Sequence, residues 1–481
     1  MANLRLEQLP AGSRDLLRAV LDVARDRAPV VVGGVVRDAR LRRRRDGAKA
    51  DVDVTVARDA LDTARRVADR VGGAYVALDE ERGAARVVTA DARLDVTDLR
   101  APTLEADLAA RDFTVNALAV PLAPLLERGR AAIVDPTGGL ADLAAGRLRP
   151  AGPTVLADDP VRALRGVRLE AELPLRLTAA AARAIRAVAP TLTRVSPERI
   201  RDEILAILRV PQTAPALRRL DALGLLTVVF PEVEPMRRSR QPLPHRFTVL
   251  EHSLRAVGGA DRLLARLDDL EPFGDELAAH VRTTLGGGID RRQVLKLAAL
   301  LHDVSKPETR REVNGRIRFF EHDTIGADRV RAIGERLKLP ERATTLLERL
   351  VRHHLRMMHL GQAGEVTSRA RYRFFRDLRE DARDLLLLSL VDAAAVTGES
   401  PRSTWRRATL IHDLLRGWSE DQDLATAPPL VRGEDVMRHF GLPPGPVVGA
   451  LLRRAREAQD LGLVRTRDDV LAFLDSSENG Q

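Results

Sequence analysis

The sequence has no cysteine, which excludes disulfide bonds and thiolate metal sites. Aromatic residues make up only 3% of the chain, so stacking of bases on aromatic platforms is not expected to be its main means of recognising nucleic acid. No apolar run reaches membrane-spanning length, since the longest, LLLLSLVDAAAV, is interrupted by Asp392. The first residues lack the apolar core of a signal peptide. We therefore expect a cytoplasmic protein without membrane association.

Charge and length are the first positive features. The formal net charge of +9 favours a polyanionic partner such as nucleic acid. A chain of 481 residues with 44% hydrophobic residues can form roughly three or four domains with ordinary cores. The composition is that of a globular protein.

The most informative stretch is residues 30–56, VVVGGVVRDARLRRRRDGAKADVDVTV. The valines before Gly33 predict a buried strand, and Gly33 and Gly34 predict a turn in which the backbone can approach a ligand. The helical spacing that follows places Gly34 at a helix N-terminus with free N–H groups, and Arg37 one turn further on. This arrangement favours a bound phosphate chain.

The second half of this stretch, DVDVTV, alternates acidic and apolar residues. A period of two places Asp51 and Asp53 on one face of a strand, where a divalent cation would relieve their repulsion. We therefore predict that the pair holds Mg²⁺. The segment RLDVTDL adds Asp95 on a neighbouring strand, as a third catalytic carboxylate or as an ordinary surface aspartate. The alternative for the whole stretch is a glycine turn beside a solvated acidic strand.

A further polar group lies in AARDFTVNALAV, residues 109–120. Arg111, Asp112 and Asn116 occur at one-turn intervals ahead of an apolar segment. A guanidinium with nearby carboxylate and amide groups can bind a triphosphate and a ribose hydroxyl. We therefore include all three residues in a nucleotide-binding set with Gly33, Gly34 and Arg37.

The overall pattern predicts an α+β head followed by all-α domains. In the head, a helix over 59–71 and strands over 74–78, 84–90 and 92–98 predict a mixed sheet. From about residue 150 strand signals stop, and the apolar spacing predicts neck helices over 158–172, 178–189, 197–208 and 212–223.

Several motifs together resemble a known family. VGGVVRD, DVDV and ARDFTVNALAV are followed by IVDPTGGLADL (133–143), DDPVRALRGVRLEAEL (158–173) and SPERIRDEI (196–204). In this order they resemble the class II tRNA nucleotidyltransferases and the related bacterial poly(A) polymerases, whose head is of the polymerase-beta type. The chain departs from the family pattern at Ala110, where arginine is usual, and at Asp158, where glutamate is usual.

One pair in the neck has a distinct possible role. Asp159 and Arg162 are three residues apart, which would place them on one helix face, where they could hydrogen-bond a base edge or form a simple ion pair. The resemblance favours base reading and adds Arg165 and Arg168 to the nucleotide-binding set.

A second constellation lies between residues 236 and 425. His252, His302, Asp303 and Asp392 have the spacing of metal ligands and resemble the core ligands of the HD phosphohydrolase domain, with Ser305 in place of its usual glycine. A second metal could be held by His322, His353 and His354. We expect one or two divalent metals here, the alternative being a catalytically silent remnant.

The segment GLPPGPVVG near the C-terminus resembles the closing segment of the same family and predicts two helices around a turn. We therefore predict a nucleotidyltransferase head at 1–150, a neck at 151–235, an HD domain at 236–425 and a tRNA-binding tail at 426–481. The implied reaction adds CCA, or part of it, to tRNA 3′ ends from CTP and ATP. The alternatives are a poly(A) polymerase, an RNA-end phosphohydrolase and a non-catalytic RNA-binding protein. The oligomeric state stays open.

Overall fold

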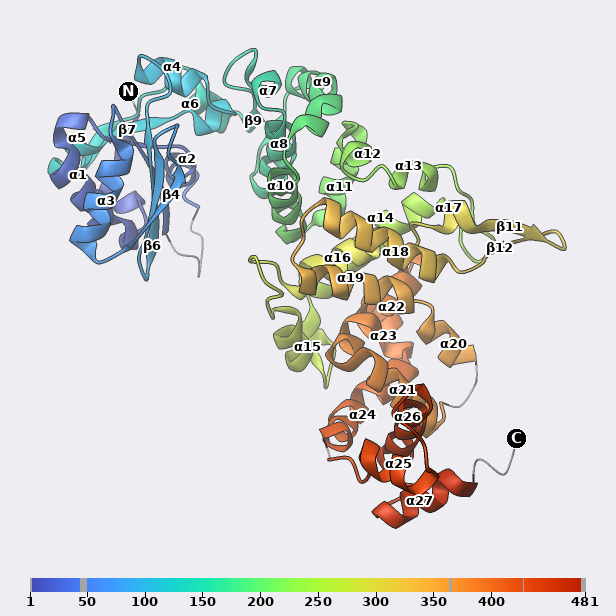
Figure 1. Cartoon of the computed structure of the whole chain (residues 1–481). Coiled ribbons are helices and arrows are strands. Elements are labelled where there is room, and N and C mark those ends of the chain that lie inside the picture. Colours follow the sequence, from blue (N-terminus) through green and yellow to red (C-terminus); the bar gives the residue numbers. More distant parts are fainter. Residues whose placement is uncertain (1, 44–49, 363–365, 427, 477–481) are drawn as a thin grey trace. The chain divides into compact units, whose positions relative to one another are not determined.

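The computed structural model describes residues 2–43, 50–362, 366–426 and 428–476. It contains two compact units (Figure 1). Unit 1 consists of Met1–Ile207 and Arg219–Val229, and unit 2 of Leu208–Arg218 and Phe230–Gln481. Among the described residues, no helix has both the length and the apolar composition needed to cross a bilayer.

Unit 1 is built on a six-stranded sheet in the order β4–β5–β6–β3–β2–β7. The central strands β3 and β6 run parallel, and their other neighbours run antiparallel, so the sheet is mixed as predicted. The strands are β2 (Val30–Val32), β3 (Ala50–Val56), β4 (Ala74–Asp79), β5 (Ala84–Val88), β6 (Ala92–Asp98) and β7 (Ala119–Pro121).

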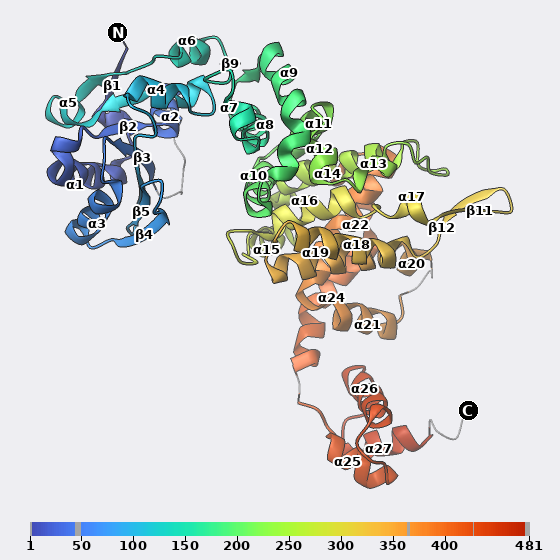
Figure 2. The same ribbon diagram turned by 45° about the horizontal axis from the view of Figure 1, so that its top comes forward.

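The alternation of apolar and polar residues in β3 determines which of its side chains lie on each face of the sheet. Val52, Val54 and Val56 are buried in one apolar cluster with α1 (Arg14–Ala24) and α3 (Ala60–Val71), which lie side by side next to the sheet (Figures 1 and 2). Because successive side chains of a strand point to opposite faces, Asp51 and Asp53 lie on the face away from this cluster. The apolar residues of β3 thereby direct its acidic residues away from the core.

The rest of unit 1 is mainly helical. Short strands β1 (Asn3–Arg5), β8 (Arg130–Ala132), β9 (Arg147–Leu148) and β10 (Arg176–Leu177) form two small sheets. The helices of the head are α2 (Gly34–Arg40), α4 (Leu104–Ala109), α5 (Leu122–Glu127) and α6 (Gly139–Ala144). The neck helices are α7 (Val155–Asp158), α8 (Val161–Glu172), α9 (Ala179–Val188), α10 (Pro197–Arg209), α11 (Thr213–Ala222) and α12 (Leu225–Val229). Of these, the end of α10 and the part of α11 up to Arg218 belong to unit 2.

The helix predicted over 158–172 is wrong at its start. Helix α7 ends at Asp158, and Asp159 has an extended backbone before Pro160, so α8 begins only at Val161. The ring of a proline disfavours the helical conformation in the residue before it, which explains the break. Asp159 and Arg162 therefore do not share one continuous helix, although they remain neighbours.

Unit 2 is a helical body with one hairpin, which the sequence did not predict. Its helices are α13 (Val233–Met236), α14 (Val249–Leu264), α15 (Gly274–Val281), α16 (Arg291–Leu301), α17 (Lys306–Thr309), α18 (His322–Arg336), α19 (Glu341–His353), α20 (Arg356–Gln362), α21 (Ser368–Leu378), α22 (Ala382–Thr397), α23 (Pro401–Arg407) and α24 (Thr409–Thr426). The hairpin strands are β11 (Arg310–Val313) and β12 (Arg316–Phe319).

The last three helices of unit 2 are α25 (Gly433–Phe440), α26 (Pro446–Asp460) and α27 (Arg467–Ser476). They share an apolar cluster of their own, which includes Val436, Leu451 and Leu474. Gly441 ends α25 with φ of +65°, a conformation that glycine adopts without steric cost. The glycine and proline pattern of this segment therefore predicted the turn between two helices correctly.

Candidate active site

A cavity of about 1600 Å³ opens on the acidic face of the unit 1 sheet and extends to helix α8. It brings together every residue predicted for the nucleotidyltransferase site except Asp159. The predicted residues that line it are Gly33, Gly34, Arg37, Asp51, Asp53, Asp95, Arg111, Asp112, Asn116, Arg162, Arg165 and Arg168. The cavity is therefore a candidate active site.

The carboxylates lie where β3 and β6 run side by side. Asp53 pairs directly with Asp95 in the parallel register, and Asp51 lies two residues before Asp53 on β3. Burial raises the pKa of Asp53 to about 6, and the negative charges of Asp95 and Asp51 add to the rise, while Arg111 opposes it. The raised pKa of Asp53 thus reflects mainly its burial, and the oxygen donors of this group suit a hard divalent cation.

The glycine turn packs directly against this carboxylate group. Gly33 has φ of +78°, and a Cβ atom at this position would lie 3.1 Å from Asp53 Oδ2 and 3.7 Å from Arg111 Nη1. A side chain here would need a strained backbone and would crowd the acidic group. Glycine at position 33 thus allows the backbone before α2 to approach Asp53 closely.

Asp95 has a partner that sequence reasoning missed. Arg86 on β5 donates from Nε and Nη2 to the two oxygens of Asp95, at 2.7 and 2.8 Å. The antiparallel register of β5 and β6 pairs these residues directly. Arg86 thus forms a bidentate ion pair with Asp95, whereas Asp51 and Asp53 have no such partner among the described residues. The catalytic role of Asp95 stays a prediction.

The raised pKa of Asp53 gives a testable pH dependence. Between the usual aspartate pKa of 3.8 and the folded value of about 6, the folded state binds the proton more tightly, so stability falls as the pH rises. We expect Asp53→Asn to raise the unfolding free energy of β3 at pH 7.5, without divalent cations, by about 3 kcal/mol. Hydrogen exchange of the β3 amides measures this gain, which should nearly vanish at pH 4. An equal gain at both pH values would contradict the assignment.

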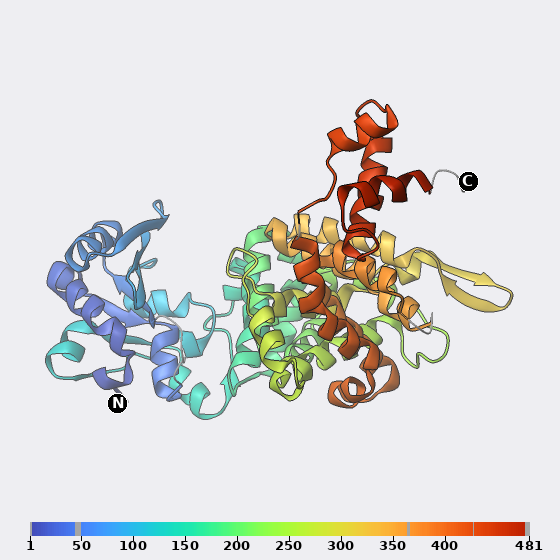
Figure 3. The ribbon, with the colours of Figure 1, turned by 90° about the horizontal axis from the view of Figure 1, so that it is seen from below.

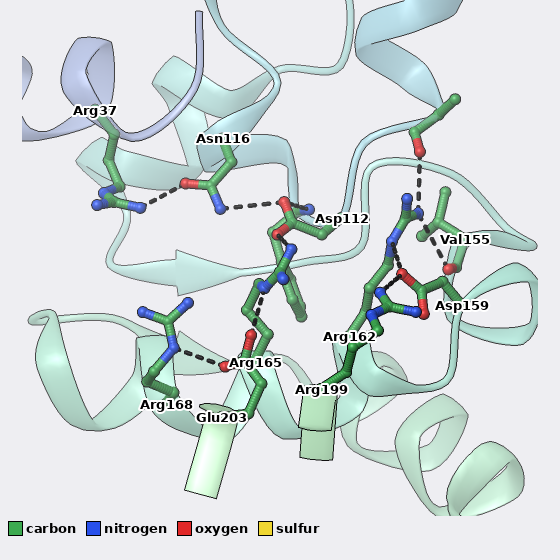
Figure 4. Close-up of polar contacts among 12 residues, drawn as sticks. Arg37, Asp112, Asn116, Val155, Asp159, Arg162, Arg165, Arg168, Arg199 and Glu203 are labelled. Carbon is green, nitrogen blue, oxygen red and sulfur yellow. Dashed lines mark hydrogen bonds and ion pairs between the residues drawn. The ribbon is translucent and has the colours of Figure 1, made fainter. Parts of the chain in front are cut away.

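Arg37 is positioned by a chain of hydrogen bonds (Figure 4). Its Nη1 donates to the Asn116 side-chain oxygen at 2.5 Å, and its Nε donates to Asp38 at 2.8 Å. Asn116 in turn donates to Asp112 at 3.1 Å. This chain holds Arg37 at the edge of the cavity, one turn into α2.

The chain continues into the neck. Arg165 Nη1 donates to Asp112 at 3.2 Å, and its Nε donates to the buried Glu203 of α10 at 2.8 Å. Burial alone would raise the pKa of Asp112, but Arg165 and hydrogen bonds from Asn116 and a backbone N–H bring it below its ordinary value. Glu203 also accepts a 2.8 Å bond from Arg168 (Figure 4). Sequence reasoning missed Glu203, although it lies in the SPERIRDEI motif.

Arg162 and Asp159 lie together beside the cavity (Figure 4). Arg162 Nε is 3.5 Å from Asp159 Oδ2, and Arg162 Nη1 donates to the backbone oxygens of Ala110 and Val155 at 3.0 and 3.2 Å. Asp159 also accepts a 2.7 Å bond from Arg199. Arg162 and Asp158 line the cavity, whereas Asp159 does not.

Unit 2 contains two groups of side chains whose ligand atoms lie within 4.8 Å of one another. One is His252, His302 and Asp392, and the other is Asp303, His322 and His354. They come from α14, α18, α22 and the ends of α16 and α19. The sequence predicted all six as ligands. It grouped Asp303 with His252, His302 and Asp392, whereas the structure places Asp303 with His322 and His354. His353 belongs to neither group and lies near Arg356, which with burial lowers its pKa.

The two groups together form a candidate metal centre, and their donor chemistry fits divalent cations. The Nδ1 atoms of His302, His322 and His354 lie 3.1, 3.0 and 2.6 Å from backbone oxygens. If each Nδ1 donates its proton there, the unprotonated Nε2 atoms face the centre. The Oδ1 atom of Asp303 is buried without a hydrogen-bond partner, and Asp392 Oδ1 lies 2.9 Å from His252 Nε2. Cations would satisfy these converging lone pairs and carboxylate oxygens.

Three polar residues beside these groups did not enter the predicted ligand set. Lys306 Nζ lies 2.7 Å from Asp303 Oδ2 and donates to the side-chain oxygen of Gln241 at 2.7 Å. The ring of His245 lies 5.1 Å from that of His252, between centroids. Burial, with Lys306 nearby, lowers the pKa of His245 to about 4. The segment between α13 and α14, which carries Gln241 and His245, thus also contributes to this site.

Comparison with known protein families divides the chain in a consistent way. Residues 101–149 match the poly A polymerase head domain, and residues 175–237 match the probable RNA and SrmB-binding site of polymerase A. Residues 249–397 match the HD domain. The head match includes Arg111, Asp112 and Asn116 of the cavity, and the HD match includes both ligand groups of unit 2.

Whole-chain relatives narrow the family. The chain is 37% identical over 452 residues to the A-adding tRNA nucleotidyltransferase of Deinococcus radiodurans, covering 92% of this chain and 94% of the relative. It is 34% identical to the CC-adding tRNA nucleotidyltransferase of Thermus thermophilus, covering 92% of each chain. A solved CCA-adding enzyme in complex with ATP shares the fold, with a TM-score of 0.65, 19% identity, and coverage of 99% of this chain and 100% of that one. The predicted family is confirmed, and the protein belongs to the tRNA nucleotidyltransferases.

Proposed function

We propose that this enzyme adds CCA, or part of it, to tRNA 3′ ends by attack of the terminal hydroxyl on the α-phosphorus of CTP or ATP, with release of pyrophosphate. The observation that carries the proposal is the cavity of unit 1, in which a carboxylate group and several guanidinium groups face one space. The relatives favour this reaction over polyadenylation and over a purely hydrolytic role. A tRNA substrate favours a cytoplasmic location.

Asp51 and Asp53 are the proposed ligands of Mg²⁺ in the head. Mg²⁺ bound there would supply charge neutralisation and activation of the attacking hydroxyl. The deprotonated form of Asp53 is the one that binds a cation, and its raised pKa indicates that protons compete for the same oxygen. Asp95, held by Arg86, would place its negative charge beside the pair and orient the reacting group.

The remaining cavity residues are proposed to bind the nucleotide. Arg37 and Arg111 supply guanidinium groups for the triphosphate, next to the backbone of Gly33 and Gly34. Asp112 and Asn116 would receive the ribose hydroxyl. The ion pairs from Glu203 to Arg165 and Arg168 restrict both side chains before the nucleotide binds, which lowers the entropy lost on binding.

We propose the same four-part organisation that the sequence predicts: a head at 1–150, a neck at 151–235, an HD domain at 236–425 and a tail at 426–481. The family matches and the separate apolar cluster of α25–α27 support these divisions. The HD domain would hold one or two divalent metals, with His252, His302 and Asp392 at one position and Asp303, His322 and His354 at the other. Tail contacts would be to tRNA phosphates.

The reaction is tested with tRNA transcripts that end before the CCA, after the first C or after CC. Each is incubated with CTP alone, ATP alone or both, and product lengths are measured on a sequencing gel. The proposal expects extension of at least one transcript by C, A or both, stopping at the mature end. Unlimited A addition to any RNA would instead identify a poly(A) polymerase, and no extension of any transcript would refute nucleotide addition.

A further inference from the structure

The β11–β12 hairpin of unit 2 extends away from the neighbouring helices in three views (Figures 1, 2 and 3). Its base lies at the metal centre. His322, which follows the hairpin, has its Nδ1 3.0 Å from the Phe319 backbone oxygen, and the Lys306 ammonium lies 5.5 Å from the Phe319 ring centroid. The hairpin therefore links a solvent-exposed tip directly to the ligands of the metal centre.

One face of this hairpin is strongly basic. Arg311 pairs with Arg318 and Val313 pairs with Arg316 in the antiparallel register, so all four side chains point to the same side. The other side carries Arg310 and Glu312, which are exposed, and Ile317 and Phe319, which are half-buried. Arg311, Arg316 and Arg318 are exposed, so one side of the hairpin is a basic face and the other is mixed.

The basic face has no compensating acidic groups. Among the described residues, none of the guanidinium groups of Arg311, Arg316 and Arg318 forms an ion pair, and Arg311 donates only to the backbone oxygens of Glu308 and Arg310. Like charges directly across a strand pair destabilise it. An external polyanion would remove this repulsion, and guanidinium groups match phosphate geometry well.

We propose that this arginine face is a docking surface for single-stranded RNA, separate from the nucleotidyltransferase cavity, which leads the RNA to the metal centre. The choice of RNA over an acidic protein rests on the proposed function. It is also supported by Phe320, which follows β12 and is 54% exposed, so that a base can stack on its ring. The exposed ring favours RNA, because base stacking on it adds to the phosphate contacts of the arginines.

The experiment measures binding of a fluorescent 12-nucleotide RNA to the full chain by anisotropy, over a range of salt concentrations. We expect the triple variant R311S/R316S/R318S to weaken binding at least about tenfold at low salt and to reduce the salt slope by about 2. The matched control R262S/R282S/R342S removes the same charge from exposed arginines of unit 2 that also form no ion pair among the described residues, and it should change binding less than about threefold.

Two further variants separate the contribution of charge from that of base stacking. R311K/R316K/R318K keeps the charge and should retain most of the affinity, which guards against a folding defect. Phe320→Ala should weaken binding at least about fivefold without changing the salt slope, because stacking releases no counterions. Photo-crosslinking of RNA that contains 4-thiouridine should label the peptide over 310–320.

Three outcomes would overturn the proposal: equal losses in the two serine triples, crosslinks confined to unit 1, or displacement of the RNA by polyglutamate of equal charge at the same concentration. The last outcome would identify an acidic protein as the partner. Because the probe is not a tRNA, this experiment can fail while the extension assay succeeds, and the reverse also holds.

Discussion

Replacing Asp53 by asparagine is expected to lower nucleotide addition at least about a thousandfold, which corresponds to a barrier increase of about 4 kcal/mol. The substitution keeps the shape of the side chain but removes the negative charge that the proposed Mg²⁺ requires. It also removes the buried charge whose pKa is raised to about 6, so the variant should fold at least as well as the parent. Single-turnover addition of CTP or ATP to a saturating tRNA acceptor measures the effect.

The control for Asp53 lies in the other metal centre. Asp303→Ala should remove metal from unit 2, measured by atomic emission, while nucleotide addition continues, because its ligands come from a separate part of the chain. His353→Ala is the matched variant, since His353 lies outside both ligand groups and should leave the metal content unchanged. If Asp53→Asn retained addition within about tenfold, or roughly 1.4 kcal/mol, the assignment of Asp53 as a metal ligand would be wrong.

The second large effect is expected at Arg162, which we propose reads the base together with Asp159. Cytosine and adenine both present an amino donor beside a ring-nitrogen acceptor, so a carboxylate and a guanidinium can satisfy either edge. Uracil and guanine place a carbonyl where the amino group should be, which costs about 1–3 kcal/mol for each unpaired group. Arg162→Ala should therefore reduce the preference for CTP and ATP over UTP and GTP by about tenfold to a hundredfold.

Neighbouring variants test whether this effect is specific to the base. Arg168 is held by Glu203 and Glu172, so Arg168→Ala should lower the use of all four nucleotides alike. Asp159→Ala should change the selectivity among the four nucleotides. Asp158→Ala tests the alternative that Asp158, which lines the cavity, supplies the acceptor. Loss of selectivity in Asp158→Ala alone would move the acceptor role to that residue. If Arg162→Ala left the selectivity ratios unchanged, the pair of Arg162 and Asp159 would be only a structural ion pair.

Local patterns in the sequence determined much of this protein. The alternation in DVDVTV placed Asp51 and Asp53 on one strand face, because residues two apart in a strand always share a side. Apolar spacing located the head sheet and most neck helices to within a few residues. The histidine and aspartate positions between 252 and 392 predicted a metal site, and the structure brings six of the seven predicted ligands into two candidate groups.

Only the tertiary structure decided which side chains meet. Strand register pairs Arg86 with Asp95, and helix packing brings Glu203 to Arg165 and sorts six ligands into two groups. These contacts join residues far apart in the chain, so no local period predicts them. The raised pKa of Asp53 likewise depends on burial and on the distance to other charges, which are properties of the packed sheet and not of any one segment.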